Sequence, residues 1–154
     1  MTDLPVRRDE LRDLPLLKAA LICETVIPRN DGVLSLINIV DRRTMTASGT
    51  AVPPEMPPQE WEFNLVLLFN SGAYVGKAAI AIAVQGPDGL RKPVHSAEHY
   101  FEGEDRGANL ILQMKFAFKT EGLYWFEVYV NDQPMTRVPL RVMYQRVTRT
   151  LPPP

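Results

Sequence analysis

Apolar and polar residues alternate with a period of two through most of this chain, and short turn sequences separate the alternating segments. Large apolar residues occupy every odd position of 61–69, and they occupy the even positions of 110–118 and 124–130. A period of two places alternate side chains on opposite faces of a β-strand. Turn sequences such as Asn30-Asp31-Gly32 and Gly86-Pro87-Asp88-Gly89 fall between such segments. The pattern predicts an all-β domain.

Seven or eight strands are predicted by this pattern, and a regular series of short strands is typical of a sandwich or a barrel. The sequence Gly122-x-Tyr124-x-Phe126 resembles the tyrosine corner of immunoglobulin-like domains, in which a Tyr near a strand start is tied back to the preceding turn. We therefore expect a two-sheet antiparallel β-sandwich of immunoglobulin-like type. The predicted strands are Leu17–Ile27, Val33–Asp41, Trp61–Phe69, Lys77–Val84, Lys92–Tyr100, 110–118, 124–130 and 138–144.

Three details of this prediction concern the placement of single strands. Val33–Asp41 has apolar residues on both faces, which indicates a strand near the middle of a sheet. Residues 46–59 contain four prolines and are expected to form an extended crossover loop, because proline gives no N–H to a ladder. Pro139 indicates that the closing strand lies at a sheet edge. Cys23 is expected on the core face of the first strand.

The 154 residues fit one domain of about the usual size, large enough to fold without a metal or a disulfide. We expect a flexible or short helical arm over residues 1–15, the sandwich over 16–145 and a Pro-rich tail over 146–154.

Composition excludes several classes of partner. The net charge of -1 argues against a dedicated nucleic-acid binder, and the apolar runs are far shorter than the roughly 20 residues of a membrane helix. The N-terminal charges are not followed by an apolar run, so we expect no signal peptide. Cys23 is the only cysteine, which fits a reducing compartment. We expect a cytoplasmic protein.

The opening segment Ala20-Leu21-Ile22-Cys23-Glu24-x-Val26 and the following Gly32-x-Leu34-Ser35-Leu36-Ile37-x-Ile39 resemble an uncharacterised bacterial family of small all-β proteins, a domain of unknown function. The late Gly122-x-Tyr124-x-Phe126 strand and Pro139-Leu140-Arg141-Val142 also resemble that family. The resemblance implies an immunoglobulin-like fold and an intracellular location. It implies no activity and no catalytic residue.

His95-Ser96-Ala97-Glu98-His99 matches H-x-x-E-H, the signature of inverted zincins. That chemistry needs two His one helical turn apart, facing one metal ion. Pro93 precedes the motif and the surrounding pattern is β, so His95 and His99 would share a strand face while Glu98 points away. We favour two surface histidines beside an acidic loop, formed by Glu98, Glu102, Glu104 and Asp105. Divalent-metal or small-ligand binding by residues 95–105 remains the alternative, and a metal-dependent hydrolase is the least favoured.

Aromatic and basic residues mark a second candidate region. Trp125 and Tyr129 lie opposite to the apolar face of their strand, and Arg137, Arg141 and Met143 share one face of the closing strand. Trp125, Tyr129 and Met143 indicate an apolar patch that either marks an interface or is covered by the N-terminal arm. The arginines, with Arg146 and Arg149, indicate either charges that protect a sheet edge or a docking strip for an acidic partner. We expect a non-catalytic module without a cofactor, which binds a protein partner or self-associates.

Overall fold

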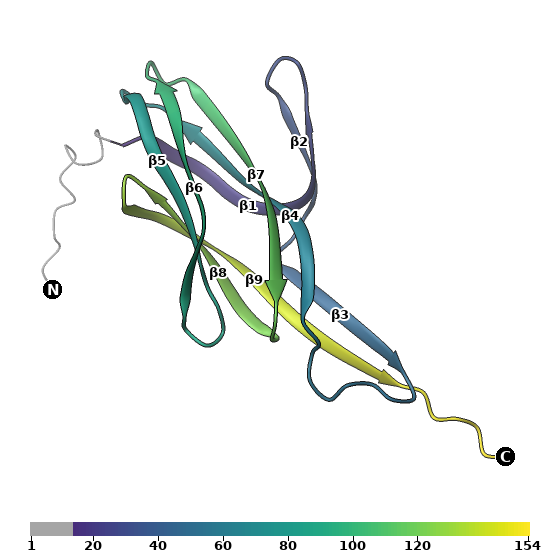
Figure 1. Ribbon diagram of the computed structural model, residues 1–154. Coiled ribbons are helices and arrows are strands. Elements are labelled where there is room, and N and C mark those ends of the chain that lie inside the picture. Colours follow the sequence, from purple (N-terminus) through teal and green to yellow (C-terminus); the bar gives the residue numbers. More distant parts are fainter. Residues whose placement is uncertain (1–13) are drawn as a thin grey trace, which may run out of the picture.

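The computed structural model describes residues 14–154, which form nine strands in two sheets that pack face to face (Figure 1). One sheet has the antiparallel order β2-β1-β4-β7. The other has the order β3-β9-β8-β5-β6, in which only β3 and β9 run parallel. The strands are β1 (Leu16–Pro28), β2 (Leu34–Ile39), β3 (Arg42–Gly49), β4 (Gln59–Asn70), β5 (Val75–Gln85), β6 (Arg91–Glu102), β7 (Gly107–Phe118), β8 (Gly122–Val130) and β9 (Gln133–Thr148).

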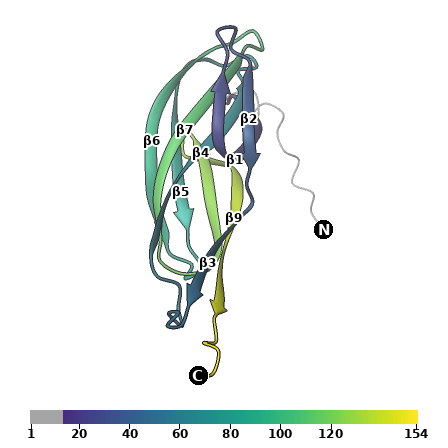
Figure 2. The same ribbon diagram turned by 90° about the vertical axis from the view of Figure 1, so that its right-hand side faces the viewer.

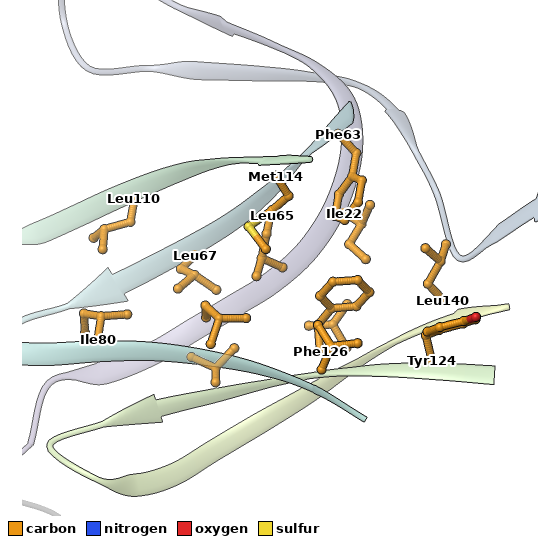
Figure 3. Packing of buried hydrophobic residues seen from close by; sticks show 14 of the residues in the cluster. Ile22, Phe63, Leu65, Leu67, Ile80, Leu110, Met114, Tyr124, Phe126 and Leu140 are labelled. Carbon is orange, nitrogen blue, oxygen red and sulfur yellow. The ribbon is translucent and has the colours of Figure 1, made fainter. Parts of the chain in front are cut away.

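The core lies between the two sheets and is built by the alternation seen in the sequence. The odd residues of β4 from Trp61 onward and the even residues of β8 from Tyr124 onward are buried and face the gap between the sheets (Figure 3). Phe63 of β4 packs edge to face on Phe126 of β8, with ring centroids 5.4 Å apart. Burial of each such side chain stabilises the fold by about 1.5–3 kcal/mol. The all-β two-sheet prediction is therefore confirmed.

Nine strands replace the expected seven or eight, because part of the predicted Pro-rich loop is a strand. β3 occupies residues 42–49, which precede the first proline of the loop, and it pairs in parallel with the second half of β9. Figure 2 shows that β3 and the end of β9 extend together beyond the other strands. The remaining loop returns one apolar side chain, Met56, to the core.

Two predictions about strand position need correction. β2 is an edge strand rather than a central one, because it pairs with β1 on one side only; Leu34 and Leu36 are half-buried, and Ile37 and Ile39 are exposed. β9 pairs with β8 over residues 133–142 and with β3 over residues 141–148, so the edge predicted from Pro139 holds for the first half of the strand, where β8 is its neighbour on one side only. Pro139 lies in that half, where no neighbouring strand requires its missing N–H.

Cys23 also faces the opposite side from the one predicted. A bulge between Leu17 and Ala19 reverses the alternation of β1, so Ile22 enters the main core. Cys23 and Val66, both 0% exposed, belong to no part of that core. They lie on the outer side of the four-stranded sheet, toward which the β1–β2 hairpin folds back until Gly32 accepts a hydrogen bond from Asn109.

Tyr124 connects the start of β8 to the turn before it. Its hydroxyl donates a hydrogen bond of 2.6 Å to the carbonyl oxygen of Thr120, and its ring packs on Phe118 at 4.9 Å. The tie from Tyr124 to the preceding turn is thus present, as the sequence predicts.

Replacing Tyr124 with Phe should lower the free energy of unfolding by about 0.5–1.5 kcal/mol, because the buried Tyr124 loses its part-buried hydrogen bond to Thr120. Tyr144→Phe is the matched control, since its hydroxyl donates to Pro53 at the surface, where water can replace it. Urea unfolding curves measure both values. An equal or larger loss for Tyr144→Phe would contradict this role of Tyr124.

Of the arm predicted over residues 1–15, residues 1–13 lie outside the part of the chain that the structure describes.

Candidate functional site

The five residues predicted to contact a partner share one surface, the outer face of the five-stranded sheet. Trp125 and Tyr129 project from β8, and Arg137, Arg141 and Met143 project from the neighbouring β9. All five occupy odd positions, whereas the core takes the even positions of β8 and those of β9 from Val138 to Val142. The alternation that builds the core therefore also gathers these side chains on the solvent side.

A buried carboxylate lies at the centre of this outer face. Glu127 is only 4% exposed although it projects away from the core. Its Oε1 lies 2.8 Å from Nε of Arg91, and its Oε2 accepts a hydrogen bond of 3.3 Å from the hydroxyl of Tyr129. A buried carboxylate is costly unless it is paired and hydrogen-bonded, and both kinds of partner are present here.

Arg91 reaches Glu127 from a strand that is not its neighbour. Arg91 belongs to β6 and Glu127 to β8, with β5 between them, so the two backbones are about 10 Å apart. Ala83 lies on β5 directly opposite Glu127. Because Ala83 is small, the Arg91 side chain can extend over β5 to the carboxylate.

The guanidinium of Arg137 stacks on Trp125, with its central carbon 4.2 Å from the ring centroid. Such cation–π contacts stabilise by about 0.5–1 kcal/mol at exposed positions. Pro139 lies opposite Trp125 on β9. Trp125 and Arg137 are thus held in a defined arrangement.

An open depression of about 590 Å³ lies between these groups. Its lining includes the Arg91–Glu127 pair and Tyr129 on one side and Met135 and Arg137 on the other. The depression brings one aromatic, one apolar and several charged side chains within reach of a single ligand segment.

The outer face is positively charged. Arg91 neutralises Glu127, whereas Arg137 and Arg141 are exposed and Arg42 of β3 lies directly opposite Arg141. The two other arginines near the C-terminus do not belong to this surface: Arg146 occupies an even position and donates to the carbonyl of Val52, and Arg149 lies beyond β9.

The H-x-x-E-H motif lies on β6 and is fully extended. His95 and His99 are opposite Ile82 and Ala78, on the core side, and are about 13 Å apart along the strand. Glu98 is on the other side, with a carboxylate oxygen 3.8 Å from Nζ of Lys77. The two imidazoles therefore cannot share one ion in this conformation. Within residues 14–154 no three His, Cys, Asp or Glu side chains group together as a metal site would require.

The acidic loop after β6 carries its own counter-charge. Arg106 contacts Glu102 at 2.9 Å and Glu104 at 3.2 Å, and hydrogen bonds to these carboxylates raise the pKa of its guanidinium. His99 packs on Phe101 with ring centroids 5.0 Å apart. Nε2 of His95 is buried without a hydrogen-bond partner. Through these contacts, residues 95–106 are part of the structure at the β6 edge of the sandwich.

Cys23 is buried beside the backbone of its own strand, and its Sγ lies 3.7 Å from the carbonyl oxygen of Thr25. Burial raises the pKa of its thiol, which keeps the sulfur protonated and a poor nucleophile. The prediction of a buried thiol is confirmed.

Arg91 and Glu127 were not predicted from the sequence. Glu127 lies between Trp125 and Tyr129 on the face of the strand that points away from the core. In the sequence it is therefore indistinguishable from an ordinary solvent-exposed acid. Only the register of three strands shows that Arg91 meets it.

The comparisons with known proteins identify a family but no activity. The model described as "Family of unknown function (DUF6941)" matches residues 18–143. No curated protein matches the sequence. Among solved structures, the Pseudomonas fluorescens alkylpurine DNA glycosylase AlkC bound to DNA containing an abasic site analog is similar at 10% identity and a TM-score of 0.41, over 80% of this chain. The chain spans only 30% of the length of that solved chain.

Residues 14–154 contain no helix that is long and apolar enough to cross a membrane.

Arg91→Met should lower the free energy of unfolding by about 1–3 kcal/mol, because it leaves the buried Glu127 carboxylate without its counter-charge. Glu127→Gln should cost less, since Arg91 is largely exposed and regains water. Arg106→Met is the control for an exposed pair and should change stability by less than about 0.5 kcal/mol. Urea unfolding measures all three, and a smaller effect of Arg91→Met than of Glu127→Gln would refute this order.

Native Cys23 should resist a small alkylating reagent and should react readily once the chain is unfolded in urea. The expected cause is burial of the thiol. Mass spectrometry after timed iodoacetamide treatment measures both rates. Equal rates in native and unfolded protein would show that the thiol is accessible.

Proposed function

Since the chain belongs to DUF6941, a family of unknown function, we propose its function from its own surface. We propose that it is a non-catalytic interaction module that binds a protein partner through the outer face of the five-stranded sheet. The contact surface consists of Trp125, Tyr129, Arg137, Arg141 and Met143, with the Arg91–Glu127 pair at its centre.

The observation that carries this proposal is the ordered arrangement around Glu127. Its ion pair with Arg91 and its hydrogen bond from Tyr129 fix these side chains, while Arg137 and Trp125 stack on one another. Trp, Tyr and Arg are the residue types that contribute most of the affinity in protein interfaces. Side chains that are already ordered lose less conformational entropy when a partner binds.

The charge of the surface indicates the chemistry of the partner. Arg137, Arg141 and Arg42 are exposed on this face, and Glu127 is already paired with Arg91. We therefore propose an acidic partner segment, in which carboxylates contact the arginines and an apolar side chain contacts Trp125 or Met143.

Small-ligand or divalent-metal binding by residues 95–105 is the alternative function. It has weaker support, because Arg106 already contacts Glu102 and Glu104, and the two His are about 13 Å apart along β6. The ion pairs occupy carboxylates that a cation would need.

We further propose that the sandwich is of the immunoglobulin-like type and that the protein is cytoplasmic. The Tyr124–Thr120 hydrogen bond has the geometry of a tyrosine corner. The order β9-β8-β5-β6 corresponds to the G-F-C-C′ order of variable-type immunoglobulin domains. The lone, buried thiol of Cys23 supports a reducing location.

The test begins with proteins captured by the wild-type chain from an extract of its native host. Each captured protein is purified, and its Kd is measured for wild type, Trp125→Ala and Arg137→Glu. Both substitutions should weaken binding more than about tenfold, because each removes an interface anchor. Raising the salt concentration should weaken wild-type binding, as expected for charge pairing.

The matched control is Lys18→Glu, which makes the same charge reversal at an exposed position on β1 of the other sheet. It should leave the Kd unchanged. If no captured protein loses affinity through Trp125→Ala and Arg137→Glu while retaining it in Lys18→Glu, the outer face is not the docking surface.

A further inference from the structure

β2 leaves one side of its backbone unpaired at the edge of the four-stranded sheet (Figure 1). Its sequence, LSLINI, contains no charged residue and no proline. The side chains of Ile37 and Ile39 are 41% and 63% exposed. An exposed apolar edge strand is a ready template for pairing with another strand.

The other three edge strands carry features that oppose such pairing. β6 has Lys92, Pro93 and a bulge opposite Ile82 and Ala83. β3 begins with Arg42 and Arg43 and continues with exposed Thr and Ser. β7 carries Lys115, which pairs with Glu60 at 3.2 Å. Charges, prolines and bulges are the usual means by which native sheets prevent edge pairing. Within residues 14–154, β2 is the one edge strand that contains neither a charged residue nor a proline.

The unpaired edge is held in place by the rest of the hairpin. N–H of Arg29 donates to the carbonyl of Val33 at 2.9 Å, and the side-chain amide of Asn38 donates to Glu24 at 2.8 Å. Asn38 has a φ of +56°, which ends the regular part of the ladder. Residues 34–37 therefore offer a short, ordered edge.

We propose that β2 pairs antiparallel with β2 of a second copy of this chain, around a two-fold axis at Ser35. Antiparallel pairing places the start of one strand beside the end of the other. About an axis at Ser35, Leu34 lies opposite Leu36 of the other copy and Val33 lies opposite Ile37. The strand is therefore complementary to itself, because apolar side chains meet on both faces of the paired strands and no charged residue lies between them.

This surface lies on the opposite sheet from the proposed docking face, so the two proposals can fail separately. The direct test is the mass of the full chain by light scattering across a range of concentrations. We expect a shift from the monomer mass of 17.4 kDa to twice that value as concentration rises. Amide hydrogen exchange in residues 34–37 should slow over the same range.

Ile37→Lys should weaken the dimer more than about tenfold, because a charge then replaces the apolar side chain that faces Val33 of the other copy. Val147→Lys is the matched control: Val147 is 40% exposed at the far end of β9, so its substitution should leave the dimer intact. A monomer at every concentration overturns the proposal. So does a dimer that Val147→Lys dissociates and Ile37→Lys does not, or one without slower exchange in β2.

Discussion

The packing of the two sheets against one another determines which side chains of the central strands face the core. Each of these strands gives one face to the core, and that face carries Phe63 in β4 and Phe126 in β8. The residues between them must then face outward. Trp125, Glu127 and Tyr129 lie on the outer side of the sheet for this reason, in a row of alternate positions along β8. The candidate docking face is therefore a direct consequence of the core.

In the described part of the chain, Glu127 is the one residue on the outer face of the five-stranded sheet that is as buried as a core residue. A carboxylate that is 4% exposed needs compensation, and Arg91 and Tyr129 supply it from β6 and from the same strand. The compensation depends on Ala83, whose small side chain leaves room for Arg91 to cross β5. An ion pair of this kind contributes little net stability, but it does hold the side chains around it in one arrangement. Such order is useful for binding, since a partner meets groups that are already positioned.

Sequence patterns predicted those parts of the fold in which large side chains alternate without interruption. β4 and β8 were found because Trp61, Phe63 and Phe126 make the period obvious. β3 was missed because Thr, Ser and Ala alternate weakly there, and its stability comes from pairing with the distant β9. The face of Cys23 was predicted wrongly because a single bulge after Leu17 reverses the parity of β1. The grouping of Trp125 with Arg137 followed from parity alone, whereas the Arg91–Glu127 pair depends on the register of three strands, which no local pattern contains.

The central claim is that a partner contacts the outer face of the five-stranded sheet. The chain has two tryptophans, of which Trp61 is 8% exposed in the core and Trp125 lies on that face. Their indole N–H groups give two separate signals in a proton–nitrogen correlation spectrum, which can be followed while a purified partner is added. The account predicts that the Trp125 signal moves with the bound fraction while the Trp61 signal stays in place. Binding that leaves the Trp125 signal unmoved would contradict it.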